Sequence, residues 1–380
     1  KNPVGNLARF ISDGSTNTLR MTIDNGNCNE NFFLLTPADP NGQSLPYANN
    51  FQPNGSAMFQ AANVFSFTVH SDVGIDPNNI SVNLNGQNAS GLTFSGLPTT
   101  WSVGCPISSN KIYTAIITLT DSVGTAIFTN YFDTLDTNTT YTFEVEDYDY
   151  SGGQFIDNPQ IGAYTNKSGI LDVDDHWNYN TGIPYRPSAG AGEGLSFESP
   201  SGDVIRPGYG GADYNVGHND GANWANYTRH YPAGTYNILI RYASPNGSPN
   251  IIDAAKISLV TGGWGTTNQA TTQLGTFTTH NTGGWGTYNN GWAPLMDVNG
   301  NMVQFVSDGS TNTLRYTVDN GGFNVDFFAL VPADTNAPVI ADAYPNGAYK
   351  FQNSSTFSFT AGSAAGIASS EISVLLTGTN

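Results

Sequence analysis

The chain has 380 residues, of which 30 are Asp or Glu and 12 are Lys or Arg, so its formal net charge is −18. This acidity argues against nucleic acids and disfavours anionic membranes as partners, because too few cations are present to neutralise a run of phosphates or lipid headgroups. Aromatic residues make up 12% of the chain, which argues against disorder, and no apolar run approaches the roughly 18 residues of a membrane-spanning helix. Helix formers are scarce, so the predicted class is all-β.

An internal repeat organises the chain. ISDGSTNTLR at 11–20 recurs as VSDGSTNTLR at 306–315, an offset of 295 residues, and PNGSAMFQAANVFSFTV at 53–69 recurs as PNGAYKFQNSSTFSFTA at 345–361, an offset of 292. The terminal partial copies hold too few strands to bury a core by themselves. We therefore expect this chain to be a window cut from a longer tandem array.

Strand-like runs define two kinds of module. In 39–137, runs such as Phe65–Val69, Ile80–Leu84 and Tyr113–Leu119 alternate apolar residues between Asn-Gly, Pro and Asp turns, the pattern of a small antiparallel sandwich. The longer stretch 138–334 places long glycine-rich loops between strands, which favours a jelly roll. The predicted domains are a C-terminal jelly-roll fragment, an immunoglobulin-like (Ig-like) sandwich, a complete jelly roll and the first half of a second Ig-like sandwich, at 1–38, 39–137, 138–334 and 335–380.

Two acidic residues lie on one face of the strand that opens the long module. In Tyr141–Tyr148, Glu144 and Glu146 point to one side of the strand while Phe143 and Val145 point to the other. Paired carboxylates repel each other unless a cation lies near them, and a hard cation such as Ca²⁺ prefers oxygen ligands. The alternative is a solvated strand face.

Several blocks of the long module, taken together, resemble carbohydrate-binding modules of families 6 and 35. FEVEDYDYSGG at 143–153 is similar to their opening strand, and Gly221–Tyr227 and Pro232–Tyr236 resemble their central stretch. Thr282–Thr287 and Gly321–Phe327 resemble the two loop-and-strand blocks before their end. Module 39–137 more weakly resembles a bacterial Ig-like domain.

The resemblance implies a jelly roll with a structural calcium ion between its first and last strands. Carried over position by position, Glu144, Glu146 and Asp326 would be the carboxylate ligands. In the N-terminal partial copy, Asn31 stands where Asp326 stands, so that copy is expected to bind calcium more weakly or not at all.

The resemblance also implies a sugar site built from loops. Trp285 matches the position that stacks on a sugar ring, and Asn320 or Asn324 would supply a hydrogen-bonding amide. Tyr288 and Trp292 are expected to extend the platform, while His218 occupies a place where the family often has a second stacking tyrosine. The alternative for Trp285 is core packing or an interface between modules. Trp224 is expected in the core.

The remaining candidates are weaker. Cys28 and Cys105 form one possible disulfide, with two buried free thiols as the alternative. The acidic segment Asp172–Trp177 lacks the spacing of a calcium-binding loop and favours a solvated loop. We find no G-x-S-x-G elbow, zinc-ligand spacing or other catalytic set.

The sequence therefore predicts a non-catalytic tandem-repeat protein, extracellular and at a cell surface, that binds polysaccharides or cell-surface glycans or adheres through its jelly rolls. Neighbouring copies of the repeat are expected partners, and no membrane insertion is expected. One alternative is a segment of an extracellular fibre or stalk without sugar binding. Another is an accessory region of a large polysaccharide-degrading enzyme.

Overall fold

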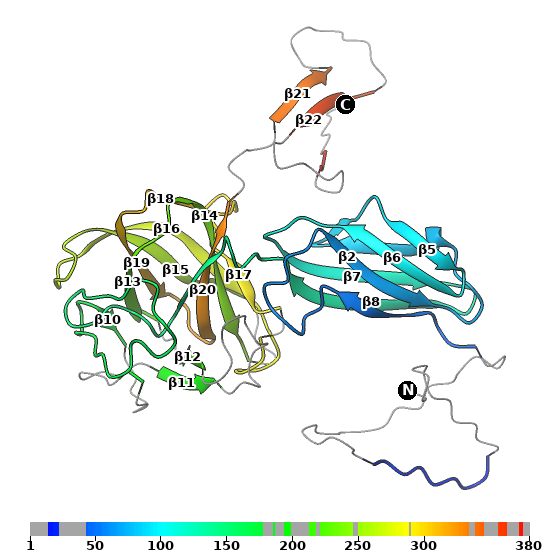
Figure 1. Ribbon diagram of the computed structural model, residues 1–380, viewed down its shortest axis with the longest axis horizontal. Coiled ribbons are helices and arrows are strands. Elements are labelled where there is room, and N and C mark those ends of the chain that lie inside the picture. The colour runs from blue at the N-terminus through cyan, green and yellow to red at the C-terminus, as the bar shows by residue number, and fades with distance from the viewer. Residues whose placement is uncertain are drawn as a thin grey trace, which may run out of the picture.

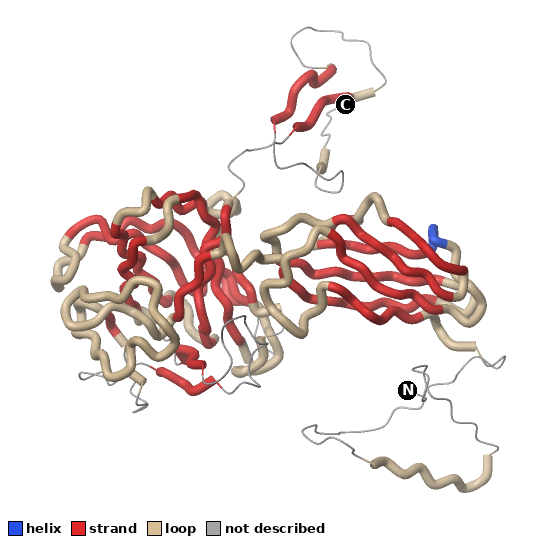
Figure 2. Tube along the Cα trace, viewed as in Figure 1, coloured by secondary structure: helices blue, strands red, loops and turns tan. Residues whose placement is uncertain are grey.

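The computed structural model describes residues 14–22, 43–177, 185–186, 194–198, 213–217, 221–245, 250–288, 290–333, 339–345, 356–362 and 372–374. These residues form an all-β protein, as the sequence predicted (Figures 1 and 2). The only helix among them is a short 3-10 turn, Pro77–Asn79. No helix in this part of the chain is long and apolar enough to cross a membrane.

The smaller sandwich consists of two four-stranded antiparallel sheets. Strand β2 explains their packing, because Phe65, Phe67 and Val69 alternate with polar residues and all point into the core. On the neighbouring strand, Cys105 and Val103 lie opposite Phe65 and Phe67. The sheet orders are β1-β2-β6-β5 and β4-β3-β7-β8. The strands are β1 (Tyr47–Gln52), β2 (Val64–His70), β3 (Ile80–Leu84), β4 (Gln87–Asn88), β5 (Thr93–Leu97), β6 (Thr100–Pro106), β7 (Ile112–Thr120) and β8 (Thr125–Asp133).

The larger sandwich packs a five-stranded sheet, order β10-β13-β19-β15-β16, against a seven-stranded one. The seven-stranded sheet has the order β11-β12-β20-β14-β17, with β18 also pairing with β14 and β9 with β20. The strands are β9 (Tyr141–Glu144), β10 (Asp175–His176), β11 (Gly194–Glu198), β12 (Asp213–Gly217), β13 (Trp224–His230), β14 (Gly234–Ala243), β15 (Ile251–Gly262), β16 (Ala270–Thr279), β17 (Trp292–Pro294), β18 (Gln304–Ser307), β19 (Thr311–Val318) and β20 (Asn324–Pro332).

Strand β20 lies near the middle of the seven-stranded sheet and is buried on both faces. Val325, Phe328 and Leu330 belong to the core between the two sheets, whereas Phe327 belongs to a second apolar cluster on the opposite face. A strand covered on both sides needs an almost continuous apolar run, and Asn324–Pro332 has one interrupted only by Asp326.

The second cluster, called the joint below, contains residues of both sandwiches, which lie next to each other in Figure 1. The rings of Phe59, from the smaller sandwich, and Phe327 lie 6.4 Å apart and nearly parallel. Asp133 ends β8 beside them and accepts hydrogen bonds from the backbone N–H groups of Phe59 and Leu135, at 2.8 and 3.1 Å. Burial raises the pKa of Asp133 to about 6, and Arg241 acts against that rise. The buried members of the joint are Met58, Leu135, Leu239, Trp292, Phe327, Ala329 and Val331.

The C-terminal partial copy repeats the start of the smaller sandwich in register. Strands β21 (Val339–Tyr344) and β22 (Ser358–Gly362) pair as β1 and β2 do, with Tyr344 opposite Ser358 where Gln52 lies opposite Ser66. Both pairs have an irregularity at the same place. Most of the N-terminal partial copy, including Asn31, lies outside the described residues.

Candidate functional site

Trp285 lies in the loop that follows β16, and its side chain is 51% exposed. Hydrogen bonds hold the loop on both sides of it. The N–H of Gly284 donates to the carbonyl of Ser244, the residue after β14, at 3.0 Å. The amide of Asn324 donates to the Trp285 carbonyl at 2.9 Å. The structure thus presents an exposed indole on a fixed backbone.

The base of the same loop is closed by a buried tyrosine. The Tyr242 hydroxyl lies 2.7 Å from Nδ1 of His280 and accepts the His280 backbone N–H at 2.9 Å. Asn290, at the other end of the loop, lies 3.2 Å from Nε2 of the same ring. Burial lowers the pKa of His280, so the imidazole that holds the loop is neutral near pH 7. Tyr242 belongs to the jelly-roll core, which ties the loop to that core.

The structure contradicts the predicted role of Tyr288 and Trp292 as part of the sugar-binding platform. Tyr288 is 2% exposed and Trp292 is 8% exposed, so neither can offer a ring face to a sugar. The Arg241 guanidinium lies 5.6 Å from the Tyr288 ring and 5.1 Å from the Trp292 ring, while Trp292 packs edge-on against Phe327 in the joint. The chain re-enters the sheet as β17 directly after Gly291, which removes Trp292 from the loop although it is close to Trp285 in sequence.

The two candidate amides lie in different places. Asn324 contacts the Trp285 loop, as described above. The amide of Asn320 instead donates to the carbonyls of Ile252 and Asp253, at 3.4 and 3.1 Å. Of the two, Asn324 is therefore the one that the structure brings to Trp285. His218 lies outside the described residues.

The three predicted calcium ligands are buried where the first and last strands of the jelly roll meet. Glu144 lies directly opposite Phe327 in the β9–β20 pair, and cross-strand partners share a face of the sheet. The register between β14 and β20 shifts between Ile240 and Tyr242, so β20 has an extra residue between Val325 and Phe328. Because those two side chains both point into the core, this bulge carries Asp326 to the opposite face, where Glu144 lies.

The chemistry of these side chains fits a hard cation, since each offers carboxylate oxygens in a buried place. No group of three or more His, Cys, Asp or Glu side chains among the described residues is already arranged to hold a metal ion. The calcium site therefore stays a proposal for Glu144, Glu146 and Asp326.

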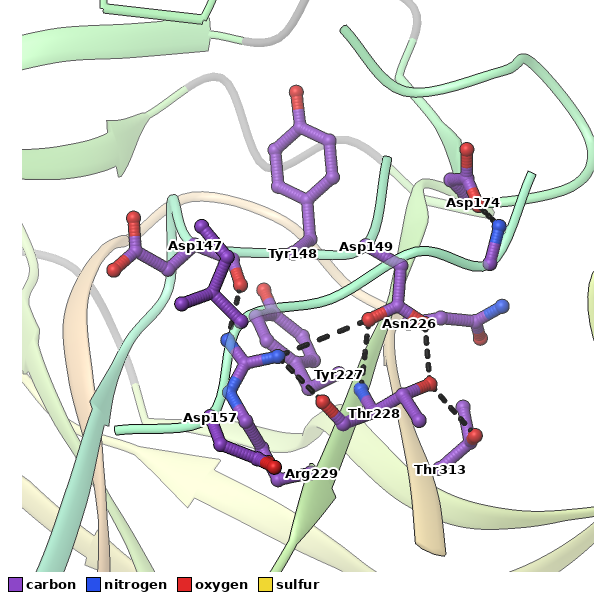
Figure 3. A network of polar contacts seen from close by, with 12 residues as sticks. Asp147, Tyr148, Asp149, Asp157, Asp174, Asn226, Tyr227, Thr228, Arg229 and Thr313 are labelled. Atoms are coloured by element: carbon purple, nitrogen blue, oxygen red, sulfur yellow. Dashed lines mark hydrogen bonds and ion pairs between the residues drawn. The ribbon is translucent and has the colours of Figure 1, made fainter. Parts of the chain in front are cut away.

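A buried polar network next to this strand was not predicted from the sequence (Figure 3). Arg229 is fully buried, and its Nη1 lies 3.8 Å from Oδ1 of Asp149, which is also fully buried. Arg229 also donates to the carbonyls of Thr228 and Asp147. Asp149 in turn accepts the backbone N–H and the hydroxyl of Thr228. The network fastens the segment after β9 onto β13.

The acidic segment Asp172–Trp177 is part of the same support. Asp174 is fully buried and accepts the backbone N–H groups of Gly152, Gly153 and Ile170. The expectation of a solvated loop is therefore wrong for this residue, because three donors replace its water. Asp172 remains outside this support and lies 2.6 Å from Nδ1 of His176.

Trp224 is half-buried and not in the core, contrary to expectation. It lies on the outer face of the five-stranded sheet, where the Arg315 guanidinium carbon is 3.8 Å from the centre of the Trp224 ring. The only sequence signal for this face was the alternation in β19, where Arg315 and Thr317 interleave with core residues.

Cys105 is buried in the smaller sandwich, and burial raises the pKa of its thiol to about 11. Its predicted partner Cys28 lies outside the described residues, so the disulfide stays a prediction.

The chain matches no protein-family model and no curated protein. It is similar to solved family 6 carbohydrate-binding modules, as the sequence resemblance predicted. One, from a Cellvibrio mixtus lichenase and solved with cellotriose, is 20% identical with a TM-score of 0.26, and the match covers 38% of this chain and 88% of that one. A β-1,3-glucan-binding module from Bacillus halodurans is 16% identical with a TM-score of 0.28, over 51% of this chain and 96% of that one.

A third family 6 module, from a Zobellia galactanivorans laminarinase, is 20% identical with a TM-score of 0.24, over 50% of this chain and 98% of that one. The strand order and register of the two packed sheets define the fold of the larger sandwich. The Ig-like interpretation of 39–137 stays a prediction.

Proposed function

We propose that the chain is a non-catalytic, extracellular glycan-binding segment whose contact with sugar is centred on Trp285. The observation that carries this proposal is an indole that is half exposed while its backbone is held by Ser244 and Asn324. A loop backbone held in this way loses little conformational freedom on binding. Its face suits the C–H groups of a pyranose, with polar side chains nearby for the hydroxyls.

The test is retention on neutral polysaccharides. A chain covering 138–334 and its Trp285→Ala variant would be compared by affinity electrophoresis on a panel of plant and microbial glucans, xylans and galactans. We expect retention on at least one polymer and a loss of at least tenfold in affinity in the variant, because one stacked ring supplies much of the binding energy of a small site. Trp264→Ala, which removes an exposed tryptophan at the opposite end of the β15–β16 hairpin, is the matched control.

Retention of no polymer, or equal affinity of the Trp285→Ala variant, would contradict the proposal. Binding by one module is expected to be weak, and repeats of the module in one chain would raise the overall affinity through multivalency.

We also propose a structural calcium ion held by Glu144, Glu146 and Asp326, supported by their burial at the junction of β9 and β20. A ligand bound only by the native state stabilises it, so chelation with EDTA should lower the unfolding temperature of the jelly roll, measured by calorimetry, and added Ca²⁺ should restore it. Glu146→Gln should reduce the effect of chelator. An unfolding temperature that EDTA leaves unchanged would count against these ligands.

A second candidate function is a segment of an extracellular rod, which the joint favours. A buried apolar contact between consecutive modules restricts their relative motion, as an extended fibre requires. The two functions predict different outcomes for Trp285→Ala, since a rod without a sugar site would lose nothing in the polysaccharide test.

A further inference from the structure

Arg315 is a half-buried residue near the middle of the outer face of the five-stranded sheet, on the central strand β19. Its neighbours across the two adjacent strands are Asn226 on β13 and Ser258 on β15. The guanidinium lies against the Trp224 ring, and the His176 ring lies nearly parallel to Trp224 at 6.5 Å between centroids. An arginine at this place is held between neighbours instead of extending into water.

Two side-chain amides fix the guanidinium. Nε of Arg315 donates to Oδ1 of Asn226 at 3.0 Å, and Nη2 donates to Oε1 of Gln269 at 2.6 Å. The orientation of both amides is set by the backbone, because the NH₂ groups of Asn226 and Gln269 each donate to the Val173 carbonyl, at 3.0 and 2.6 Å. Their oxygens must therefore face Arg315. The structure holds one edge of the guanidinium and leaves the Nη1 edge for another acceptor, since arginine has five N–H donors.

The positive charge of Arg315 has no carboxylate partner among the described residues. Asp319 pairs with the Lys256 ammonium at 2.5 Å, and Asp172 lies 2.6 Å from the His176 ring. Both acceptors that hold Arg315 are neutral amides. Burial lowers the pKa of the guanidinium to about 10, so the desolvation of this cation is not offset by an acid. In a chain with 30 acids and 12 bases, Arg315 is thus a cation whose observed acceptors are both neutral.

The internal repeat gives an independent observation. At the offset of 295, Arg20 corresponds to Arg315 and Thr22 to Thr317, and both face residues are identical in the two copies. The identity is not confined to this face, since the core residue Leu314 corresponds to Leu19, whereas the core residues Tyr316 and Phe323 correspond to Met21 and Cys28. Arg315 thus lies in a segment that both copies retain, TNTLR at 16–20 and at 311–315.

We propose that Arg315 binds an anionic group, a carboxylate or a sulfate ester, of an acidic polysaccharide. The free Nη1 edge can donate to such an oxyanion in the geometry that arginine forms with planar acceptors. Beside it on the outer face, Gln269 and Thr317 are half-buried while Asn226, Ser258 and Thr313 are buried, so the contact with the ligand is limited to the guanidinium edge. The proposal rests on the proposed function in taking a glycan as the ligand, but its residues are separate from Trp285.

The experiment uses the full chain at about 0.15 M salt, where the Debye length of about 8 Å screens the overall negative charge. Affinity would be measured by calorimetry for alginate and for a sulfated galactan, and for the same polymers after carboxyl reduction or desulfation. We expect binding to at least one charged polymer, at least tenfold weaker binding to its neutral form, and at least tenfold weaker binding by Arg315→Gln. Sodium acetate and sodium sulfate alone test whether the small anion suffices without the sugar.

Lys256→Gln is the matched control, because it removes a cation from the same face that already pairs with Asp319. The affinity of Lys256→Gln for the charged polymer should stay within about twofold of the wild type. A loss of affinity in both variants would indicate general charge attraction and overturn the proposal. Equal binding of the charged and neutralised polymers, binding of neither charged polymer, or a response to the simple anions alone would also overturn it.

Arg315→Lys covers the case in which Arg315→Gln does not fold, since it keeps the charge and loses the planar fork. It should weaken binding several-fold. The two sites are distinguishable, because Trp285→Ala should change the retention on neutral polymers and Arg315→Gln should not.

Discussion

Replacing Arg229 by methionine should lower the free energy of unfolding of the jelly roll by about 3–5 kcal/mol, the usual cost of removing one partner of a buried charge pair. Methionine has a similar length but leaves the fully buried Asp149 carboxylate without its cation. It also removes the donor to the Asp147 carbonyl, which fastens the chain after β9 (Figure 3). Urea unfolding followed by tryptophan fluorescence would measure the loss.

A double-mutant cycle with Asp149→Asn identifies the cause. If the buried charge is responsible, the double variant should be less destabilised than the sum of the single variants, by roughly 1–3 kcal/mol, because the asparagine needs no cation. A loss below about 1 kcal/mol in Arg229→Met, or strict additivity in the cycle, would show that the pair does not stabilise this network. The Thr228 contacts of residue 149 would then carry the attachment.

The second large effect is expected at the joint. Trp292→Ala should destabilise the jelly roll by about 3–5 kcal/mol, as for other large-to-alanine changes in a core. The variant removes the ring that packs against Phe327 and against the Arg241 guanidinium. Because the same ring belongs to the cluster shared by both sandwiches, proteolysis between residues 133 and 141 should become faster in the variant.

Trp285→Ala provides the control for this variant, since it removes the same side chain from an exposed position. Exposed substitutions usually change stability by less than about 0.5 kcal/mol. Comparing Trp292→Ala with Trp285→Ala therefore distinguishes a buried structural tryptophan from an exposed one, although the sequence alone placed both in one sugar-binding platform. Equal destabilisation by the two variants would mean that the joint contributes nothing beyond an ordinary surface tryptophan.

The sequence predicted much of the architecture, because local pattern and turn chemistry set the strands and the repeat set the periodicity. The alternation Phe65-Ser-Phe-Thr-Val69 gave β2, and the repeat offset of 292 reappears as the matching registers of β1–β2 and β21–β22. The resemblance of the long module to carbohydrate-binding modules also placed Glu144 beside the last strand, and the β9–β20 register shows it there.

Sequence proximity was misleading around Trp285. Tyr288 and Trp292 are three and seven residues away, yet the chain turns back into the sheet at Gly291 and buries both rings. Neighbourhood along a chain does not predict neighbourhood on a surface when a loop ends within a few residues. The same limit hid the Arg315 site, whose amides come from β13 and from the turn before β16.

By itself, the sequence determined that the chain is built from β-sandwiches, that its modules repeat, and which strands carry paired acids, because these properties depend on short-range alternation and on self-similarity. Only the tertiary structure decided which tryptophan faces water, which amide meets it, and which arginine has neutral amides as its acceptors. These depend on contacts between residues tens of positions apart, such as Asn324 with Trp285 and Gln269 with Arg315. Exposure and charge pairing are properties of the packed sheets, and no local pattern encodes them.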